Sequence, residues 1–318
     1  MILILTDQND SHAKYTIDKI SKRGLPFYKF CVDVESLQKT YVTFRESWEV
    51  VQNGSYLDFS KIKCVWCRRT FVELMLEEEY DQSNDFKIWK NEWNKTLIGI
   101  YNSLKSLPWL NPWRNAYKAE NKYFQMELAK TIGLKTPSTI ISNKKEDLVH
   151  FASQHEDVVL KLMNQDFYKS DTNQYLGFYV NKISGSDLNR FGNSIESPIV
   201  LQEYISKDYE VRYTVVGSSH FVCKIESQKS QIANVDWRRY DIPNTPHSAI
   251  APPEQIKSLV NELMKGLELE YGALDFVITN KGEWVFLEIN SMGQFLWIEE
   301  LSGLKISDEI ISWLRKYL

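Results

Sequence analysis

The sequence has few of the features that would assign it to a membrane, a nucleic acid or an oxidising compartment. No apolar run approaches the roughly 20 residues of a membrane span, so we expect no membrane partner. The formal net charge is −4 over 318 residues, which gives no case for a nucleic-acid partner. The apolar segment 1–5 is too short for a signal-peptide core and lacks a basic leader. We therefore expect a cytoplasmic protein.

Cysteine is scarce, and its four copies do not favour a redox or metal site. Cys64 and Cys67 match a C-x-x-C spacing, but a redox pair should open a helix and a zinc pair needs a second pair elsewhere. This pair lies in a predicted strand, where residues three apart point to opposite faces. We interpret both as packed thiols.

The common nucleotide and zinc motifs are missing as well. The chain contains no G-x-x-x-x-G-K-[ST] loop, no G-x-G-x-x-G after a strand and no H-E-x-x-H. If ATP binds to this protein, its phosphates are therefore not held by the common glycine cradle.

The order of the predicted elements indicates an α/β (α+β) fold. Apolar content of 43% and charged content of 25% are ordinary for a globular protein. Segments 1–6, 12–23 and 26–32 have the patterns of a strand, a helix and a strand, which predicts a parallel sheet. Later segments add antiparallel strands and helices. The proline-punctuated segment 108–113 predicts a linker and a domain boundary.

A hairpin near the end of the sequence carries the most informative residues. Residues 272–290 have the pattern of two strands joined by a tight turn at 280–282. Glu288 and Asn290 share one strand face, and a two-residue loop would place Asp275 opposite Glu288. Because facing carboxylates repel, we expect a compensating cation. Three oxygen ligands suit Mg²⁺ or Mn²⁺ better than zinc, although a solvent-facing polar hairpin fits the spacing equally well.

Several basic residues precede this hairpin, and each has an ordinary alternative. Lys161 interrupts an apolar strand and needs an anionic partner, either a phosphate or a structural carboxylate. Lys122 lies in a predicted helix over 116–132, where taken alone it reads as an exposed helix lysine. Arg212 shares a strand face with Glu210, as a cross-strand ion pair would. Arg238 lies in a polar loop, where its guanidinium binds phosphate oxygens or stays solvated.

Residues 202–205 run from a buried strand into a polar segment. The end of such a strand can offer backbone groups to a purine ring beside an apolar wall. This segment is therefore a candidate hinge for adenine.

In their order along the chain, these residues resemble the motifs of the ATP-grasp superfamily. The set consists of Lys122, Lys161, residues 202–205, Glu210, Arg212, residues 236–238, Asp275 and residues 288–290. Within the superfamily, the chain resembles ribosomal protein S6 glutamate ligase and, more closely, the microviridin-type (graspetide) macrocyclases. The closer likeness rests on residues 65–69, 120–125, 225–228, 235–238 and 290–299. Two departures are Ser291, where family members often have a proline at or beside this position, and the segment 164–175, which matches no family pattern.

The resemblance implies an ATP-grasp fold in three parts, with ATP and Mg²⁺, or Mn²⁺, as cofactors. An N-terminal parallel-sheet, peptide-binding domain would span 1–112, a central clamp 113–200 and a C-terminal catalytic part 201–318. Contacts with the nucleotide are implied for Lys122, Lys161, Glu203, Tyr204, Ile205, Glu210 and Arg238. The metal would be held by Asp275, Glu288 and Asn290. Catalysis would rest on Lys161 at the transferred phosphoryl group and on Arg212 and Arg238 at the acyl phosphate.

The activity that the resemblance implies is ATP-dependent ligation within a peptide. Asp or Glu side chains of a ribosomal precursor would be phosphorylated and then joined to Ser or Thr hydroxyls as esters, or to Lys amines as amides. The partner would be a precursor peptide with leader and core segments, and the enzyme would be a homodimer. Arg68 and Arg69 could line a groove for an acidic peptide, or they could form structural ion pairs.

Two other functions stay open at this point. One is an ATP-dependent carboxylate–amine ligase that adds a free amino acid to a peptide or small molecule. The other is a non-catalytic nucleotide- or peptide-binding module, which should have lost a metal ligand or a phosphate lysine. This sequence retains them all.

Overall fold

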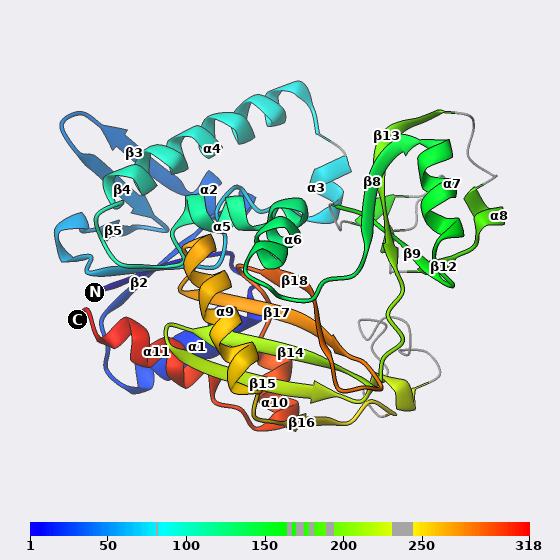
Figure 1. Ribbon diagram of the computed structural model, residues 1–318. Helices are drawn as coiled ribbons and strands as arrows, with labels where there is room; N and C mark the ends of the chain where they lie inside the picture. Colours follow the sequence, from blue (N-terminus) through cyan, green and yellow to red (C-terminus); the bar gives the residue numbers. More distant parts are fainter. Residues whose placement is uncertain (81, 164–166, 170–174, 178–180, 189–193, 231–243) are drawn as a thin grey trace.

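The first part of the chain folds as a parallel sheet, which confirms the prediction from the strand–helix–strand pattern. The computed structural model describes residues 1–80, 82–163, 167–169, 175–177, 181–188, 194–230 and 244–318 (Figure 1). The sheet has the order β2-β1-β6-β7, with β1 (Ile2–Thr6), β2 (Phe27–Cys31), β6 (Cys64–Cys67) and β7 (Trp109–Leu110). Between β1 and β2 lies α1 (Ser11–Lys22). It is ended by Gly24, whose φ of 65° is the left-handed backbone conformation common just after a helix C-terminus. The segment predicted as a linker therefore contributes a strand, β7.

Antiparallel strands and long helices complete this part of the chain. A three-stranded sheet has the order β3-β4-β5, as the aromatic alternation before residue 60 predicts. Its strands are β3 (Thr40–Phe44), β4 (Trp48–Gln52) and β5 (Ser55–Leu57). The helices are α2 (Val34–Gln38), α3 (Leu76–Tyr80) and α4 (Asn84–Ser103), with a short 3₁₀ turn, η1 (Phe59–Lys61). Ser83 caps α4 through its hydroxyl, which accepts a hydrogen bond from the amide of Phe86 at 3.1 Å.

The next helical segment, predicted as a single helix over 116–132, is two helices. They are α5 (Trp113–Ala119) and α6 (Lys122–Thr131). Asn121 separates them because its side-chain oxygen accepts the amide of Phe124 at 3.1 Å, the geometry of a helix N-cap. Lys122 is consequently the first residue of a new helix rather than a residue in the middle of a long one.

The central clamp is a small antiparallel sheet with one helix against it. Its order is β12-β9-β13-β8, with β8 (Thr139–Lys144), β9 (Val158–Lys161), β12 (Asn181–Ile183) and β13 (Ser194–Glu203). The helices are α7 (Lys145–Ser153) and α8 (Gly185–Leu188). Leu148 and Phe151 of α7 pack on Val158 and Leu201 of the sheet. Part of the segment 164–175, which matches no family pattern, forms β10 (Phe167–Lys169), which pairs with β11 (Tyr175–Gly177).

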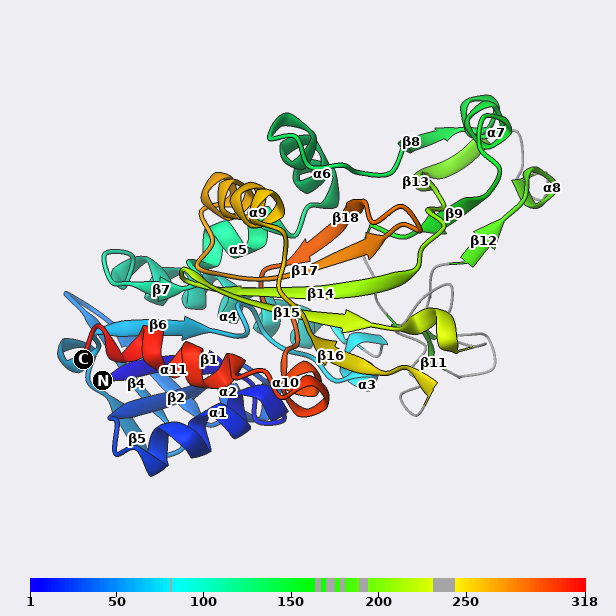
Figure 2. The same ribbon diagram turned by 60° about the horizontal axis from the view of Figure 1, so that its bottom comes forward.

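The last part of the chain is a five-stranded antiparallel sheet covered by helices. Its order is β16-β15-β14-β17-β18 (Figure 2). The strands are β14 (Tyr209–Val216), β15 (Ser219–Ile225), β16 (His247–Ala249), β17 (Tyr271–Ile278) and β18 (Trp284–Asn290). The helices are α9 (Glu254–Leu267), α10 (Leu296–Ser302) and α11 (Ile306–Arg315), with the 3₁₀ turn η2 (Ser227–Lys229). Among the described helices, none combines the length and the apolar character that crossing a bilayer requires.

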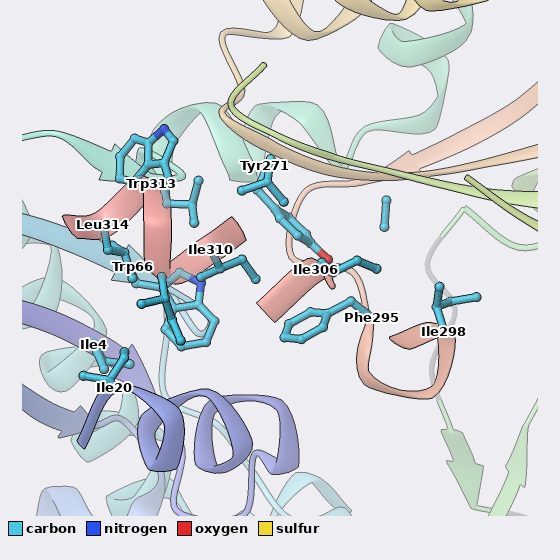
Figure 3. Close-up of a cluster of buried hydrophobic side chains, with 14 of the residues drawn as sticks. Ile4, Ile20, Trp66, Tyr271, Phe295, Ile298, Ile306, Ile310, Trp313 and Leu314 are labelled. Atoms are coloured by element: carbon cyan, nitrogen blue, oxygen red, sulfur yellow. The ribbon is translucent and has the colours of Figure 1, made fainter. Parts of the chain in front are cut away.

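A shared hydrophobic core joins the first and last parts of the chain. Trp66 of β6 and Ile4 of β1 face Ile310 and Leu314 of α11, and Phe295 extends this core toward α10 (Figure 3). Trp66 is among the largest fully enclosed side chains of the described residues. The N-terminal sheet is therefore anchored directly against the sheet that carries the candidate site.

Candidate functional site

The hairpin of β17 and β18 brings Asp275 and Glu288 face to face, which confirms the predicted register. The turn contains three residues instead of two, because the amide of Thr279 bonds to the carbonyl of Glu283. Leu287 is left unpaired as a bulge, and this one-residue shift returns the two acids to the same pair. Bulges commonly re-aim side chains beside functional sites.

Two cations of the protein compensate the facing carboxylates. Arg212, opposite Asp275 on β14, places Nη1 at 2.9 Å from Oδ1 and 3.0 Å from Oδ2 of that residue. Lys122, at the start of α6, places Nζ at 3.0 Å from Oε2 of Glu288. Lys122, Glu288, Asp275 and Arg212 thus form a row in which the two carboxylates lie between the two cations, and we call it the charge row. The repulsion inferred from the sequence therefore does not by itself require a metal ion.

The oxygen donors at this place nevertheless fit a hard divalent cation. Asp275 and Glu288 are each 8% exposed, and Asn290 stands two residues beyond Glu288 on β18, opposite Ala273. Carboxylate and amide oxygens are the donors that Mg²⁺ prefers. Within the described residues, no group of three or more His, Cys, Asp or Glu side chains is placed to bind a metal. Any metal site here therefore depends on Asn290 and on ligands that arrive with the substrate.

A cleft of about 550 Å³ lies between the clamp and the C-terminal sheet. Glu203, Tyr204 and Ile205, the predicted hinge, line it together with the turn of the β17–β18 hairpin. Its wall is charged: Lys182 Nζ lies 3.7 Å from the centre of the Tyr204 ring and 2.6 Å from an oxygen of Asp157. The structure thus places all three hinge residues along one cavity.

Glu210 does not pair with Arg212, although both lie on β14. Its Oε1 accepts hydrogen bonds from Lys207 Nζ at 2.8 Å and from Ser227 Oγ at 2.8 Å, and all three residues are buried. Lys207 was not among the residues singled out from the sequence. Its signal is the spacing of three residues from Glu210, which is visible only once the strand start is known.

Two predicted residues are placed less completely. Lys161 ends β9 opposite Val200 of β13, so it belongs to the clamp and not to the sheet that holds the charge row. Arg238 lies outside the described residues. The roles of both residues remain predictions.

The two arginines after β6 differ in their surroundings. Arg68 is 3% exposed; its Nε lies 3.1 Å from Asp10 Oδ2, a buried ion pair. A side chain enclosed in this way matches the alternative of a structural ion pair, and the peptide-binding role of Arg68 stays a prediction. The side chain of Arg69 is 32% exposed and pairs with Asp7 at 3.0 Å and Glu73 at 3.4 Å.

The C-x-x-C pair is packed, as interpreted from the sequence. Cys64 and Cys67 are free and buried, and burial raises the pKa of Cys64 to about 11 and that of Cys67 to about 12. Because the thiolate is the reactive and metal-binding form, such thiols are poorly suited to redox or zinc chemistry.

Comparisons with known proteins agree with this geometry. No curated protein matches the chain. Among solved structures, a RiPP-associated ATP-grasp ligase from Chryseobacterium gregarium, in complex with ADP and a leader and core peptide, superposes with a TM-score of 0.88 at 27% identity, over 100% of this chain and 97% of that one. Macrocyclase MdnC from Microcystis aeruginosa, bound with precursor peptide MdnA, has a TM-score of 0.86 at 26% identity, with 100% of each chain covered. D-alanyl-alanine synthetase A from Vibrio cholerae shares the fold alone, with a TM-score of 0.60 at 11% identity over 99% of this chain and 97% of that one.

Two family models divide the chain between them. A model of the MvdD pre-ATP grasp domain matches residues 1–117, and a model of the RimK-like ATP-grasp domain matches residues 119–314. The predicted ATP-grasp superfamily and α/β fold are thereby confirmed, and the bounds of the three predicted parts stay predictions. The chain belongs to the RimK-like ATP-grasp family, and it is an ATP-dependent ligase.

Proposed function

We propose that this ligase closes rings in a ribosomal precursor peptide. Asp or Glu side chains of the peptide are activated by ATP as acyl phosphates and are then joined to Ser or Thr hydroxyls, or to Lys amines, of the same peptide. The observation that supports the proposal most is the charge row, because it gathers the carboxylates and cations that phosphoryl transfer to a carboxylate requires. The peptide substrate follows from the whole-chain likeness to two ligases solved with precursor peptides.

The residues of the charge row have two alternative sets of partners in this proposal. Asp275, Glu288 and Asn290 would hold Mg²⁺, which would offset the charge of the nucleotide phosphates when bound. Lys122 and Arg212 then exchange their carboxylate partners for phosphate oxygens. The guanidinium of Arg212 presents paired N–H donors to the tetrahedral oxyanion and the departing phosphate.

The hinge cleft supplies the nucleotide side of the site. Glu203, Tyr204 and Ile205 line the cleft and would contact the adenine ring, and Glu210 would contact the ribose. Lys207 fixes the carboxylate of Glu210 through their 2.8 Å contact. Lys161 of the clamp would contact the transferred phosphoryl group, and Arg238 would contact the γ-phosphate and the acyl phosphate.

The peptide side of the site is provided by the N-terminal domain. The carboxyl ends of its parallel strands lie next to Arg68 and Arg69, and ligands of such sheets bind at that edge. Arg69 is the partly exposed arginine of the two, so we keep it as the residue that contacts the acidic core of the peptide. The partner is a precursor peptide with leader and core segments.

Mass spectrometry of a candidate precursor tests this function. The protein is incubated with ATP, Mg²⁺ and a precursor peptide encoded beside its gene. Each ring formed lowers the peptide mass by one water and releases one ADP. The variant Glu288→Gln should lower ring formation by several orders of magnitude because it removes a metal ligand. Glu49→Gln, at an exposed carboxylate of β4, is the matched control and should leave ring formation unchanged.

The opposite results are equally clear. An unchanged peptide mass, with ADP release that requires a free amino acid, would replace this function by carboxylate–amine ligation. Full activity of the Glu288→Gln variant would remove the metal assignment.

A further inference from the structure

The segment that follows Asn290 is held in place by an unusual number of polar contacts. Ser291 is buried, and its hydroxyl donates to the carbonyl of Ala116 at 3.1 Å. Its own carbonyl accepts the side-chain amide of Asn111 at 2.8 Å. Ser291, noted above as a departure from the family pattern, is thus held by these hydrogen bonds. We call residues 291–295 the post-ligand loop, because it begins directly after the proposed metal ligand.

The post-ligand loop packs closely against β17, with no room for a side chain at Gly293. A Cβ atom on Gly293 would lie 2.5 Å from Cβ of Ala273, the residue paired with Asn290. The hydroxyl of Tyr271 donates to the carbonyl of Gly293 at 2.8 Å, and Tyr271 points toward Phe295 at the end of the loop (Figure 3). A small displacement of Gly293 is therefore transmitted to the β17–β18 pair at Asn290.

The contact from the other domain is made by Arg68. Its Nη1 donates to the carbonyls of Met292 at 2.9 Å and Gly293 at 3.3 Å. Its Nε donates to Asp10, whose other oxygen caps α1 by accepting the amides of His12 and Ala13. The guanidinium thus joins the first helix of the N-terminal domain to the post-ligand loop. Figure 3 shows the same junction from its apolar side, where the N-terminal sheet meets α11 and Phe295.

We propose that Arg68 is a positioning residue of the metal site, which fixes the post-ligand loop and thereby sets Asn290 against Asp275 and Glu288. The inference rests on the proposed function, because it assumes that these three residues hold the metal. It gives the N-terminal domain a part in metal binding in addition to peptide binding. A lysine cannot take this role, because its single ammonium does not span Asp10 and two carbonyls, as the planar fork of arginine does.

The variant Arg68→Lys tests the inference because it keeps the charge beside Asp10. The probe is Mn²⁺ binding in the presence of ADP, followed by electron paramagnetic resonance, without any peptide. Loss of a group that orients a metal ligand typically lowers metal affinity about 10–100-fold, and we expect a loss in this range. Amide hydrogen exchange in residues 290–296 should accelerate in the same variant.

Lys19→Gln is the matched control. Lys19 also links α1 to the last part of the chain, through Glu299 at 3.1 Å and Asp308 at 3.2 Å, but it contacts no residue of the post-ligand loop in the described structure. This variant should bind Mn²⁺ with ADP as tightly as the wild type. Its exchange in residues 290–296 should also be unchanged.

Wild-type Mn²⁺ affinity and wild-type exchange in Arg68→Lys would overturn the inference. If that variant does not fold, Asp10→Asn takes its place, because asparagine still caps a helix but removes the charge that holds Arg68. A smaller loss of affinity in the same direction is then expected, and no loss contradicts the inference. Because neither readout uses a peptide, both remain decisive even if the wild type forms no rings and the proposed function fails.

Discussion

At the residue scale, the candidate site is a problem of buried charge. Asp275 and Glu288 lie together with little exposure, and the structure compensates them with Arg212 on one side and Lys122 on the other. Such pairs contribute little net stability, but removing one partner leaves an uncompensated buried charge. Each carboxylate of the charge row therefore has a cationic partner without nucleotide, and in the proposed function the same cations would bind phosphate oxygens.

The variant Lys122→Met should lower the free energy of unfolding by about 3 kcal/mol, because it leaves Glu288 without its cation beside Asp275. The double variant Lys122→Met/Glu288→Gln should recover most of that loss, since it removes the unpaired charge as well. Urea unfolding of the wild type, Lys122→Met, Glu288→Gln and the double variant measures both effects. A double variant that is no more stable than Lys122→Met would show that the pair is not the source of the loss.

At the scale of elements, a buried histidine, His12, accepts hydrogen bonds from the backbone amides at the start of helix α10. Nδ1 of His12 accepts the amides of Phe295 at 3.4 Å and Leu296 at 3.2 Å, so the ring must be neutral at that nitrogen. Burial and the nearby Arg68 lower the pKa of His12 to about 4, and Asp10 only partly opposes them. The start of α10 is thus fixed by the same end of α1 that holds the post-ligand loop.

This histidine predicts a pH dependence of stability. Folding lowers the pKa of His12, so between about pH 6.5 and 4 the imidazole is protonated in the unfolded chain but neutral in the folded protein. Stability should therefore fall between about pH 6.5 and 4, by about 3 kcal/mol from this residue alone. His12→Asn keeps an acceptor for the helix but does not titrate. Unfolding in urea at pH 7 and pH 4.5 should show a smaller drop for this variant, and equal drops would refute the assignment.

At the scale of the whole molecule, the clamp and the C-terminal sheet border the cleft, and the C-terminal sheet also carries three of the four charge-row residues. The sequence predicted the opening parallel strands, the order of the motifs and the pairing of Asp275 with Glu288, because each depends on local pattern or on a short turn. The pairing was predicted correctly although the turn has three residues, since the bulge at Leu287 compensates the difference.

Contacts between distant segments could not be predicted from local pattern. Arg68 and Met292 are 224 residues apart in sequence, and nothing near Arg68 indicates that its partners are backbone carbonyls of another domain. Lys122 was similarly assigned to the interior of a long helix. The pattern did not show that Asn121 caps a new helix, a role that competes with continuation of the preceding helix. The sequence indicated the candidate residues of the site through their residue types. The partners of these residues could be identified only from the folded structure.

The transfer of carboxylate oxygen to phosphate tests the central claim most directly. The side-chain carboxyl groups of Asp and Glu in the precursor are labelled with heavy oxygen, and the protein is supplied with unlabelled ATP and Mg²⁺. If each ring forms through an acyl phosphate, one labelled oxygen leaves with the phosphate for every ring closed. We predict phosphate that carries one heavy oxygen per ring when it is analysed by mass spectrometry. Ring formation with unlabelled phosphate would contradict carboxylate activation at this site.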